Sequence, residues 1–159
     1  MPKVRVRTSL AVKVAGISRI AFNEAVSDGY FNCAPKTRKG SARVFEEHEL
    51  IGLCIFGLLL ENMPAREAGL LACEAQEIAR CGRDETRIVL IKSTLRDDRM
   101  FPGSEVDQCN PERLSETLSH HGMGLERARY EFNLDTIRMI IAQAIEDELS
   151  IVGQDDGSD

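Results

Sequence analysis

An arginine and an asparagine stand one helical turn apart in a segment whose pattern predicts a short helix. Arg19 and Asn23 are four positions apart, so in a helix their side chains share one face. In the major groove of DNA, arginine binds guanine and asparagine binds adenine, each through a pair of hydrogen bonds. The spacing therefore indicates base recognition by a helix from Arg19 to Ser27. We include Ser18, which caps that helix, among the expected DNA contacts.

A second group of basic residues follows in a stretch that cannot be helical. Pro35 to Ser41 is rich in lysine, arginine and glycine, and Arg43-Val44-Phe45 has the short extended pattern of a strand. We expect a β-hairpin wing here, whose basic side chains contact phosphates or the minor groove. These side chains are Lys36, Arg38, Lys39 and Arg43.

The charge of the chain is divided unevenly along the sequence. Residues 1–45 contain nine basic and two acidic side chains, a net charge of +7. Residues 46–159 contain 11 basic and 24 acidic side chains, a net charge of −13. A basic face on a small domain is typical of proteins that bind nucleic acid, although a charged run can also be plain solvated surface. The local pattern favours the first interpretation.

The predicted elements place these residues around a small helical core. Thr8 or Ser9 can cap a first helix that runs through Ala15, and Gly16 ends it because glycine is favoured just past helix ends. A third helix runs from Glu46 to Glu61, and a fourth from Pro64 to about Arg80. Apolar residues at helical spacing in the first pair form the core that holds the second helix. They are Leu10, Val14, Ile17, Phe22 and Val26.

Several short segments, in the right order and spacing, resemble the DNA-binding domain of the MerR family of bacterial regulators. The resemblance covers roughly residues 8–70. The matching segments are Gly16-Ile17-Ser18, Gly29-Tyr30-Phe31, Pro35 to Gly40 with Arg43 and Phe45, Glu49-Leu50, and Asn62-Met63-Pro64 through Glu67-Ala68. The chain departs from the family at Asn23-Glu24-Ala25, where the family has Arg-Tyr-Tyr, and in one extra residue between Gly40 and Arg43. The resemblance implies a winged helix-turn-helix and bound DNA that is bent or twisted.

The second half has a different character and predicts a small α+β domain. Its expected elements are a buried strand at Arg87–Lys92, a short helix from Asn110 to about His120, a strand over Ala128–Leu134, and a final helix from about Asp135 to Leu149. We expect a mainly α chain with small β content, divided into residues 1–82 and 83–152 and a disordered acidic tail, 153–159. Ile137, Ile141 and Ile145 on the final helix fit either a monomer core or a homodimer surface.

The remaining reactive residues predict no catalytic or metal chemistry. The five cysteines are odd in number and form no Cys-x-x-Cys pair, which favours reduced thiols in the cytosol. Cys73 and Cys81 are eight residues apart on a helix, and we expect small buried apolar residues rather than a metal sensor. Asp97-Asp98 with Glu105 and Asp107 lack the spacing of a cation loop. No nucleotide-binding or hydrolase motif occurs, so we expect no enzyme and no cofactor.

The sequence as a whole predicts a protein that binds specific double-stranded DNA sequences. We expect a bacterial or phage transcription regulator that acts as a homodimer, with RNA polymerase as a further candidate partner. Its expected location is the cytoplasm, in association with the nucleoid, and no apolar run reaches the length of a membrane span. Two alternatives stay open. One is an excisionase-like architectural DNA-binding protein, and the other is a protein-interaction adaptor that works through the acidic second half.

Overall fold

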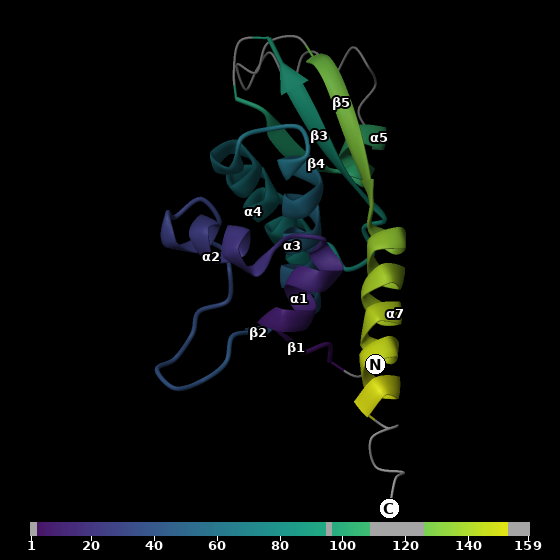
Figure 1. Ribbon diagram of the computed structural model, residues 1–159. Coiled ribbons are helices and arrows are strands. Elements are labelled where there is room, and N and C mark those ends of the chain that lie inside the picture. Colours follow the sequence, from purple (N-terminus) through teal and green to yellow (C-terminus); the bar gives the residue numbers. More distant parts are fainter. Residues whose placement is uncertain (1–2, 95–96, 109–125, 153–159) are drawn as a thin grey trace, which may run out of the picture.

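Helices make up most of the protein in the computed structural model, which describes residues 3–94, 97–108 and 126–152. Two small antiparallel sheets accompany them, so the fold is mixed α/β (Figure 1). The elements in chain order are β1 (Val6–Arg7), α1 (Thr8–Ala15), α2 (Arg19–Ser27), β2 (Val44–Phe45), α3 (Glu47–Leu60), α4 (Ala65–Cys81), β3 (Arg87–Ser93), β4 (Arg99–Pro102), α5 (Gly103–Gln108), β5 (Glu126–Asn133) and α7 (Leu134–Val152). Across these ranges, no helix is both long enough and apolar enough to cross a bilayer.

A tight turn joins α1 to α2, as the sequence predicts. Gly16 ends α1 with a φ of 68°, a left-handed conformation that glycine adopts without steric cost. Ser18 caps α2, because its Oγ accepts a hydrogen bond from the Ala21 amide at 3.0 Å. The cap expected at Thr8 or Ser9 is wrong, because α1 starts at Thr8 directly after β1 and Arg7 occupies the cap position.

The third helix, α3, is the centre of the core. It is apolar almost all round, and such a helix is stable only when buried on several sides. Five of its large side chains are almost fully inaccessible to solvent; they are Leu50, Ile51, Leu53, Ile55 and Phe56. Helix α4 packs against it with small residues that permit a close approach, namely Ala68, Ala72, Ala75 and Ala79.

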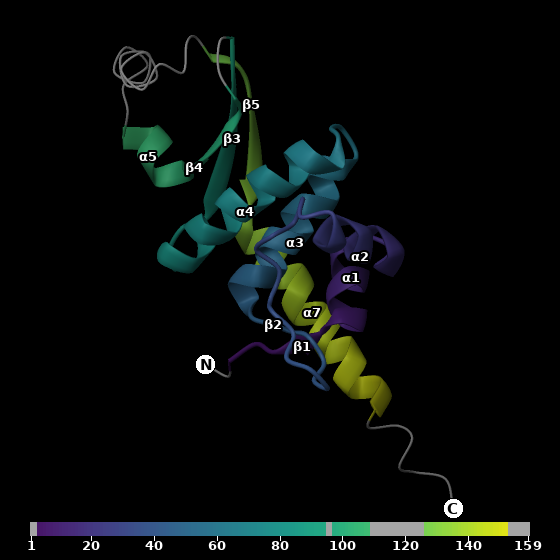
Figure 2. The ribbon, with the colours of Figure 1, turned by 90° about the vertical axis from the view of Figure 1, so that its left-hand side faces the viewer.

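The three-stranded sheet has the order β4-β3-β5, with both neighbours antiparallel to β3. Ile88 and Leu90 of β3 join the main core, whereas Val89 and Ile91 face a small second cluster with Val106 of α5. The central strand is therefore covered on both faces, which explains its unbroken apolar sequence. Figure 2 shows this sheet and the β1–β2 pair at opposite ends of the molecule.

The last helix, α7, returns from the sheet to the first helices and completes their core. Leu134, Ile137 and Ile141 are buried in the same apolar cluster as Phe22 and Phe56. Helix α7 packs on α1, α3 and β3. The division expected between residues 82 and 83 falls between α4 and β3, but the parts on its two sides share one apolar core. For Ile137 and Ile141, the structure corresponds to the monomer-core alternative.

The β-hairpin expected over residues 35–45 is wrong. Val44–Phe45 instead pairs with Val6–Arg7, with Val6 opposite Phe45. Residues 35–41 contain no strand. The missed signal is the alternation of Val4 and Val6 with Arg5 and Arg7, which has strand periodicity. The expected helix from Asn110 to His120 and the expected tail of residues 153–159 lie outside the described residues.

Candidate nucleic-acid interface

Helix α2 presents Arg19 and Asn23 to solvent from one face. Both side chains are exposed, while Phe22 and Ala25 of the same helix are buried. The Phe22 ring lies against the rings of Phe31 and Phe45, with centroids 6.3 and 5.8 Å away. This aromatic contact fixes which face of α2 points outward, so the two expected base-reading residues are free to reach a ligand.

Ser18 is exposed at the start of α2, but its hydroxyl oxygen is engaged within the protein. The Oγ atom accepts the Ala21 amide hydrogen, so the serine stabilises the helix end. Its hydroxyl proton is left to donate to a ligand oxygen. Ser18 therefore supports the position of Arg19 directly and offers one polar contact of its own.

The loop between α2 and β2 carries three of the expected basic residues into solvent. Lys36, Arg38 and Lys39 are all exposed. A turn shapes this part of the loop, because the Ser41 amide and the Ser41 hydroxyl both donate to the Arg38 carbonyl at 3.0 Å. Residues 35–41, which we call the basic loop, extend away from the body of the protein (Figure 1).

Arg43 does not belong to this exposed group. Its guanidinium lies 5.4 Å from the centroid of the Phe22 ring, a cation–π arrangement. Its Nη1 atom is buried and has no hydrogen-bond partner within the described residues. Arg43 is thus half-buried against α2, unlike the three exposed basic residues of the loop, and its expected phosphate contact stays a prediction. The residue packs the start of β2 against α2.

Three basic residues that we did not include among the expected DNA contacts lie exposed on neighbouring elements. Arg5 and Arg7 flank Val6 at β1, and Lys13 lies on α1. A shallow groove of about 380 Å³ beside the β1–β2 pair is lined by Arg5, Val6, Arg7, Val44 and Glu46. Because β2 follows the basic loop, Arg5 and Arg7 extend the positive surface from the end of that loop.

Within the described residues, the exposed side chains of this positive surface form no ion pairs with carboxylates. They are Arg5, Arg7, Lys13, Arg19, Lys36, Arg38 and Lys39. We call these seven residues the basic surface. Nearby, Glu46 is bound by Lys3 at 2.7 Å, and this hydrogen bond is the main reason that the pKa of Glu46 is lowered.

In the second half of the chain, most of the described basic residues form ion pairs with acidic side chains. The pairs are Arg80 with Glu77, Arg87 with Asp107 and Glu131, Lys92 with Asp98, Arg99 with Glu74, Arg129 with Glu126, and Arg138 with Glu47 and Asp135. The hydrogen bonds that Arg87 donates to Asp107 and that Arg129 donates to Glu126 raise the pKa of both arginines. Unpaired positive charge is thus concentrated on the first elements.

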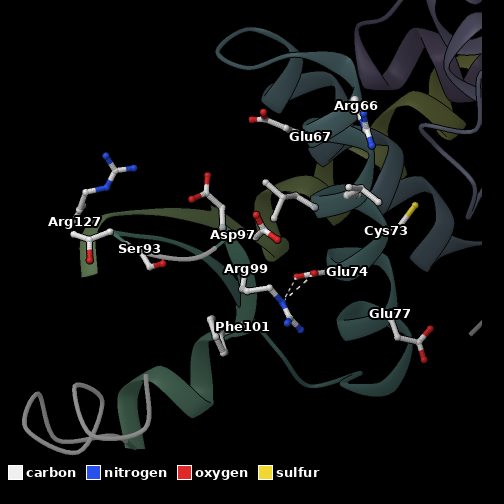
Figure 3. Close-up of a pocket in the computed structure, with 14 residues that line it drawn as sticks. Arg66, Glu67, Cys73, Glu74, Glu77, Ser93, Asp97, Arg99, Phe101 and Arg127 are labelled. Atoms are coloured by element: carbon white, nitrogen blue, oxygen red, sulfur yellow. Dashed lines mark hydrogen bonds and ion pairs between the residues drawn. The ribbon is translucent and has the colours of Figure 1, made fainter. Parts of the chain in front are cut away.

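A large groove between α4 and the β4 edge has a mixed character (Figure 3). Glu67 and Asp97 point toward it from opposite walls, with Arg66 and Arg127 at its margins. Glu74 holds the two walls together, because it pairs with Arg99 at 3.0 Å and accepts the Met100 amide hydrogen at 3.0 Å. Its acids make this groove a poor site for a polyanion. The part of the chain that is described contains no group of ligands suited to a metal ion.

The cysteines differ from the sequence-based expectation. Cys33, in the loop after α2, forms a disulfide with Cys73 on α4. Cys81 is an exposed free thiol, and Cys54 is a buried one. The expectation that Cys73 and Cys81 are small buried residues is therefore wrong. A 40-residue separation leaves no local sequence signal for such a bond, because the fold alone brings the two positions together.

Comparison with known proteins leaves the interpretation to this geometry. No protein-family model matches the chain, and no curated protein sequence is significantly similar to it.

Proposed function

We propose that the protein binds specific sequences of double-stranded DNA and regulates transcription. In this proposal α2 enters the major groove, where Arg19 and Asn23 contact base edges. Lys36, Arg38 and Lys39 contact phosphates beside it. The observation that carries the proposal is the basic surface, whose seven exposed cations lack acidic partners in the described residues.

The arrangement of the first elements supports a winged helix-turn-helix interpretation. The α1–turn–α2 unit has a capped second helix on which Arg19 and Asn23 are exposed and Phe22 is buried. In this proposal the basic loop takes the role of a wing, although it is not a hairpin. The resemblance of residues 8–70 to MerR-type domains supports the same proposal. Such a regulator would act on the nucleoid.

We also propose that the protein forms a homodimer. Its dimer interface would lie on the outer side of α7. Ile137 and Ile141 are committed to the core, but Met139, Ile140, Leu149 and Ile151 are exposed. Helices α2 and α7 lie on opposite sides of the molecule (Figure 1). A partner on α7 therefore leaves Arg19 and Asn23 uncovered. Two copies would then bind half-sites about 34–36 Å apart, one turn of DNA.

Selection of bound sites from a random DNA pool, followed by affinity measurement at two salt concentrations, tests the proposal. We expect a recurring motif and a steep loss of affinity as salt rises from 50 to 200 mM. A two-fold palindrome would support the dimer. The variant Arg83→Ala should bind DNA as wild type does, because Arg83 is exposed and lies outside the basic surface. Failure to bind DNA at the lower salt concentration would refute the proposed function.

The mixed groove beside α4 favours one alternative, a protein-interaction adaptor. Leu70 is exposed there next to Glu67, and Phe101 lies on the facing wall. An adaptor would use this groove and bind DNA weakly at every salt concentration. An architectural DNA-binding protein would instead bend DNA strongly while showing little preference among sequences. The same selection, combined with a bending assay, separates these two functions from the proposed regulator.

A further inference from the structure

The segment after α2 is fixed to α4 by contacts of three kinds. Gly69 of α4 lies directly against the Tyr30 carbonyl, where a Cβ atom would come within 2.0 Å of the oxygen. The buried Gln76 donates through Nε2 to the Cys33 carbonyl at 3.0 Å. Cys33 itself is joined to Cys73 by the disulfide. Of these three contacts, only the disulfide is a covalent bond, and thiols in solution can open and re-form it.

This bond lies at the point where the buried part of the segment becomes the basic loop. Phe31 is fully buried and stacks on Phe56, with ring centroids 5.0 Å apart, whereas Lys36 and the residues after it are exposed. At its other end the loop is held by Phe45 of β2, which is also buried. The disulfide thus fixes the first end of the loop only three residues before Lys36. Opening the bond gives Lys36, Arg38 and Lys39 more conformations to lose on binding.

We propose that the Cys33–Cys73 disulfide is a reversible redox switch that sets the affinity of the basic loop for DNA. The inference rests on the proposed function. In that function the protein works in a reducing compartment, where disulfides are usually transient and redox-sensing rather than structural. The oxidised protein holds the loop in place and binds DNA tightly. The reduced protein binds DNA more weakly.

The chemistry is thiol–disulfide exchange with a low-molecular-weight thiol. One small thiolate attacks a sulfur of the Cys33–Cys73 bond, forms a mixed disulfide and releases the other cysteine as a thiolate. A second small thiol displaces the protein from the mixed disulfide. The products are two protein thiols and one small disulfide, and the reverse sequence oxidises the protein. Both cysteines are partly exposed, and Cys73 lies at the margin of the mixed groove (Figure 3), so a small thiol has access.

The two free cysteines that the structure describes cannot substitute in this exchange. Cys54 is buried in α3, and burial raises the pKa of its thiol to about 11, so almost no thiolate forms at neutral pH. Cys81 is exposed but follows Cys73 by eight residues on α4, a rise of about 12 Å along the helix. That separation prevents direct attack on the disulfide while α4 remains folded. The Cys33–Cys73 pair is therefore the element to test.

The experiment measures the affinity of the full chain for a fluorescent 25-base-pair duplex of random sequence at low salt. Wild-type protein is compared after purification without reductant, after treatment with dithiothreitol, and after reoxidation with glutathione disulfide. We expect reduction to weaken binding by roughly three- to tenfold, and reoxidation to restore it. Circular dichroism of the same samples monitors the fold. Because a random duplex is used, the result does not depend on knowing the target sequence.

Cysteine variants identify the bond responsible. The double variant Cys33→Ser, Cys73→Ser should bind as the reduced protein does and should not respond to thiol. Cys81→Ser, the matched control, should respond like wild type. Equal binding by oxidised and reduced wild type would overturn the switch and leave the proposed function standing. A response that persists in the double variant, or unfolding on reduction, would also overturn it. No binding in either state would refute the proposed function itself.

Discussion

At the scale of single residues, the structure separates side chains that face a ligand from side chains that hold the fold. Asn23 and Phe22 are adjacent in sequence, yet one is exposed and the other is buried. Arg43 and Arg38 are both basic, but only Arg38 extends into solvent. Substitutions at these positions should therefore change different measurements, either DNA affinity or the free energy of unfolding.

Replacing Asn23 with alanine should alter base preference at one position of each half-site. A paired hydrogen bond from asparagine to adenine contributes about 1–3 kcal/mol of discrimination, and the loss should appear only with the preferred base. Competition binding with duplexes that vary at each position measures this effect. Asn62→Ala is the matched control, because Asn62 is exposed in the turn between α3 and α4. An equal loss on every duplex would exclude base recognition by Asn23.

The buried thiol of Cys54 predicts a loss of stability in alkali. Burial raises its pKa from 9.0 to about 11 in the folded state. Above pH 9 the Cys54 thiol ionises in the unfolded chain but not in the folded protein. Ionisation lowers the free energy of the unfolded state, so the folded state becomes less stable relative to it. The contribution is fully present below pH 9 and falls as the pH rises toward 11, by on the order of 2 kcal/mol.

Urea unfolding of wild type and Cys54→Ala at pH 8 and at pH 10.5 tests this expectation. The cavity left by the substitution lowers stability equally at both pH values. The difference between the two proteins should therefore shrink at the higher pH. An unchanged difference would mean that the Cys54 thiol ionises at its ordinary pKa in the folded protein.

At the scale of elements, the basic loop and α7 each allow a substitution to be compared with a matched second one. The loop is exposed along residues 36–41, so its side chains can be changed with little effect on the core. Helix α7 has one buried face and one exposed face. Adjacent residues on it therefore report on folding and on association separately.

Replacing Arg38 and Lys39 together with alanine should weaken binding to all DNA sequences alike. Each lost phosphate contact should reduce the slope of log affinity against log salt by about 0.9. Titrations at four salt concentrations measure that slope. The control pair is Arg83→Ala with Arg127→Ala, two exposed arginines of the second half. A slope equal to that of wild type would remove the basic loop from the interface.

Alanine substitutions at two neighbouring isoleucines of α7 should change the free energy of unfolding by different amounts. Ile141 is 2% exposed, and its replacement by alanine should lower the free energy of unfolding by about 2–4 kcal/mol. Ile140 is 48% exposed, and the same change should cost less than about 1 kcal/mol. Chemical denaturation checks both values. In sedimentation, Ile140→Ala should favour the monomer; a dimer unaffected by this change and by Leu149→Ala would place the interface elsewhere.

The sequence predicted the helices and the central strand far better than it predicted the contacts between them. Caps and apolar spacing are local, so Gly16, Ser18 and the strand Arg87–Ser93 were predicted correctly or nearly so. The pairing of β1 with β2 joins residues nearly forty positions apart, and no local pattern encodes it. The Cys33–Cys73 bond and the inward position of Arg43 depend on the same distant contacts. The exposure of Arg19, Asn23, Lys36, Arg38 and Lys39 was predicted; their binding to DNA stays a prediction.

At the scale of the whole molecule, the first and last thirds of the chain share one core. A fragment of residues 1–82 lacks Leu134, Ile137 and Ile141, each of which contributes about 1.5–3 kcal/mol through burial. That sum is comparable with the entire stability of a small domain. We expect the fragment to lose cooperative unfolding in urea. A peptide of residues 134–152 added in trans should restore it, whereas cooperative unfolding of the fragment alone would show two separate cores.

The return of α7 to the first helices also has a consequence for synthesis on the ribosome. Helices α1 and α3 are complete once residue 60 has emerged, but Ile141 follows about eighty residues later. At a typical rate of about 5–20 residues per second, that interval lasts roughly 4–16 seconds. During this time the apolar surface that α7 will cover is exposed in the nascent chain. The growing polypeptide is thus a candidate client for a ribosome-associated chaperone, and slow codons between residues 60 and 134 would lengthen its exposure.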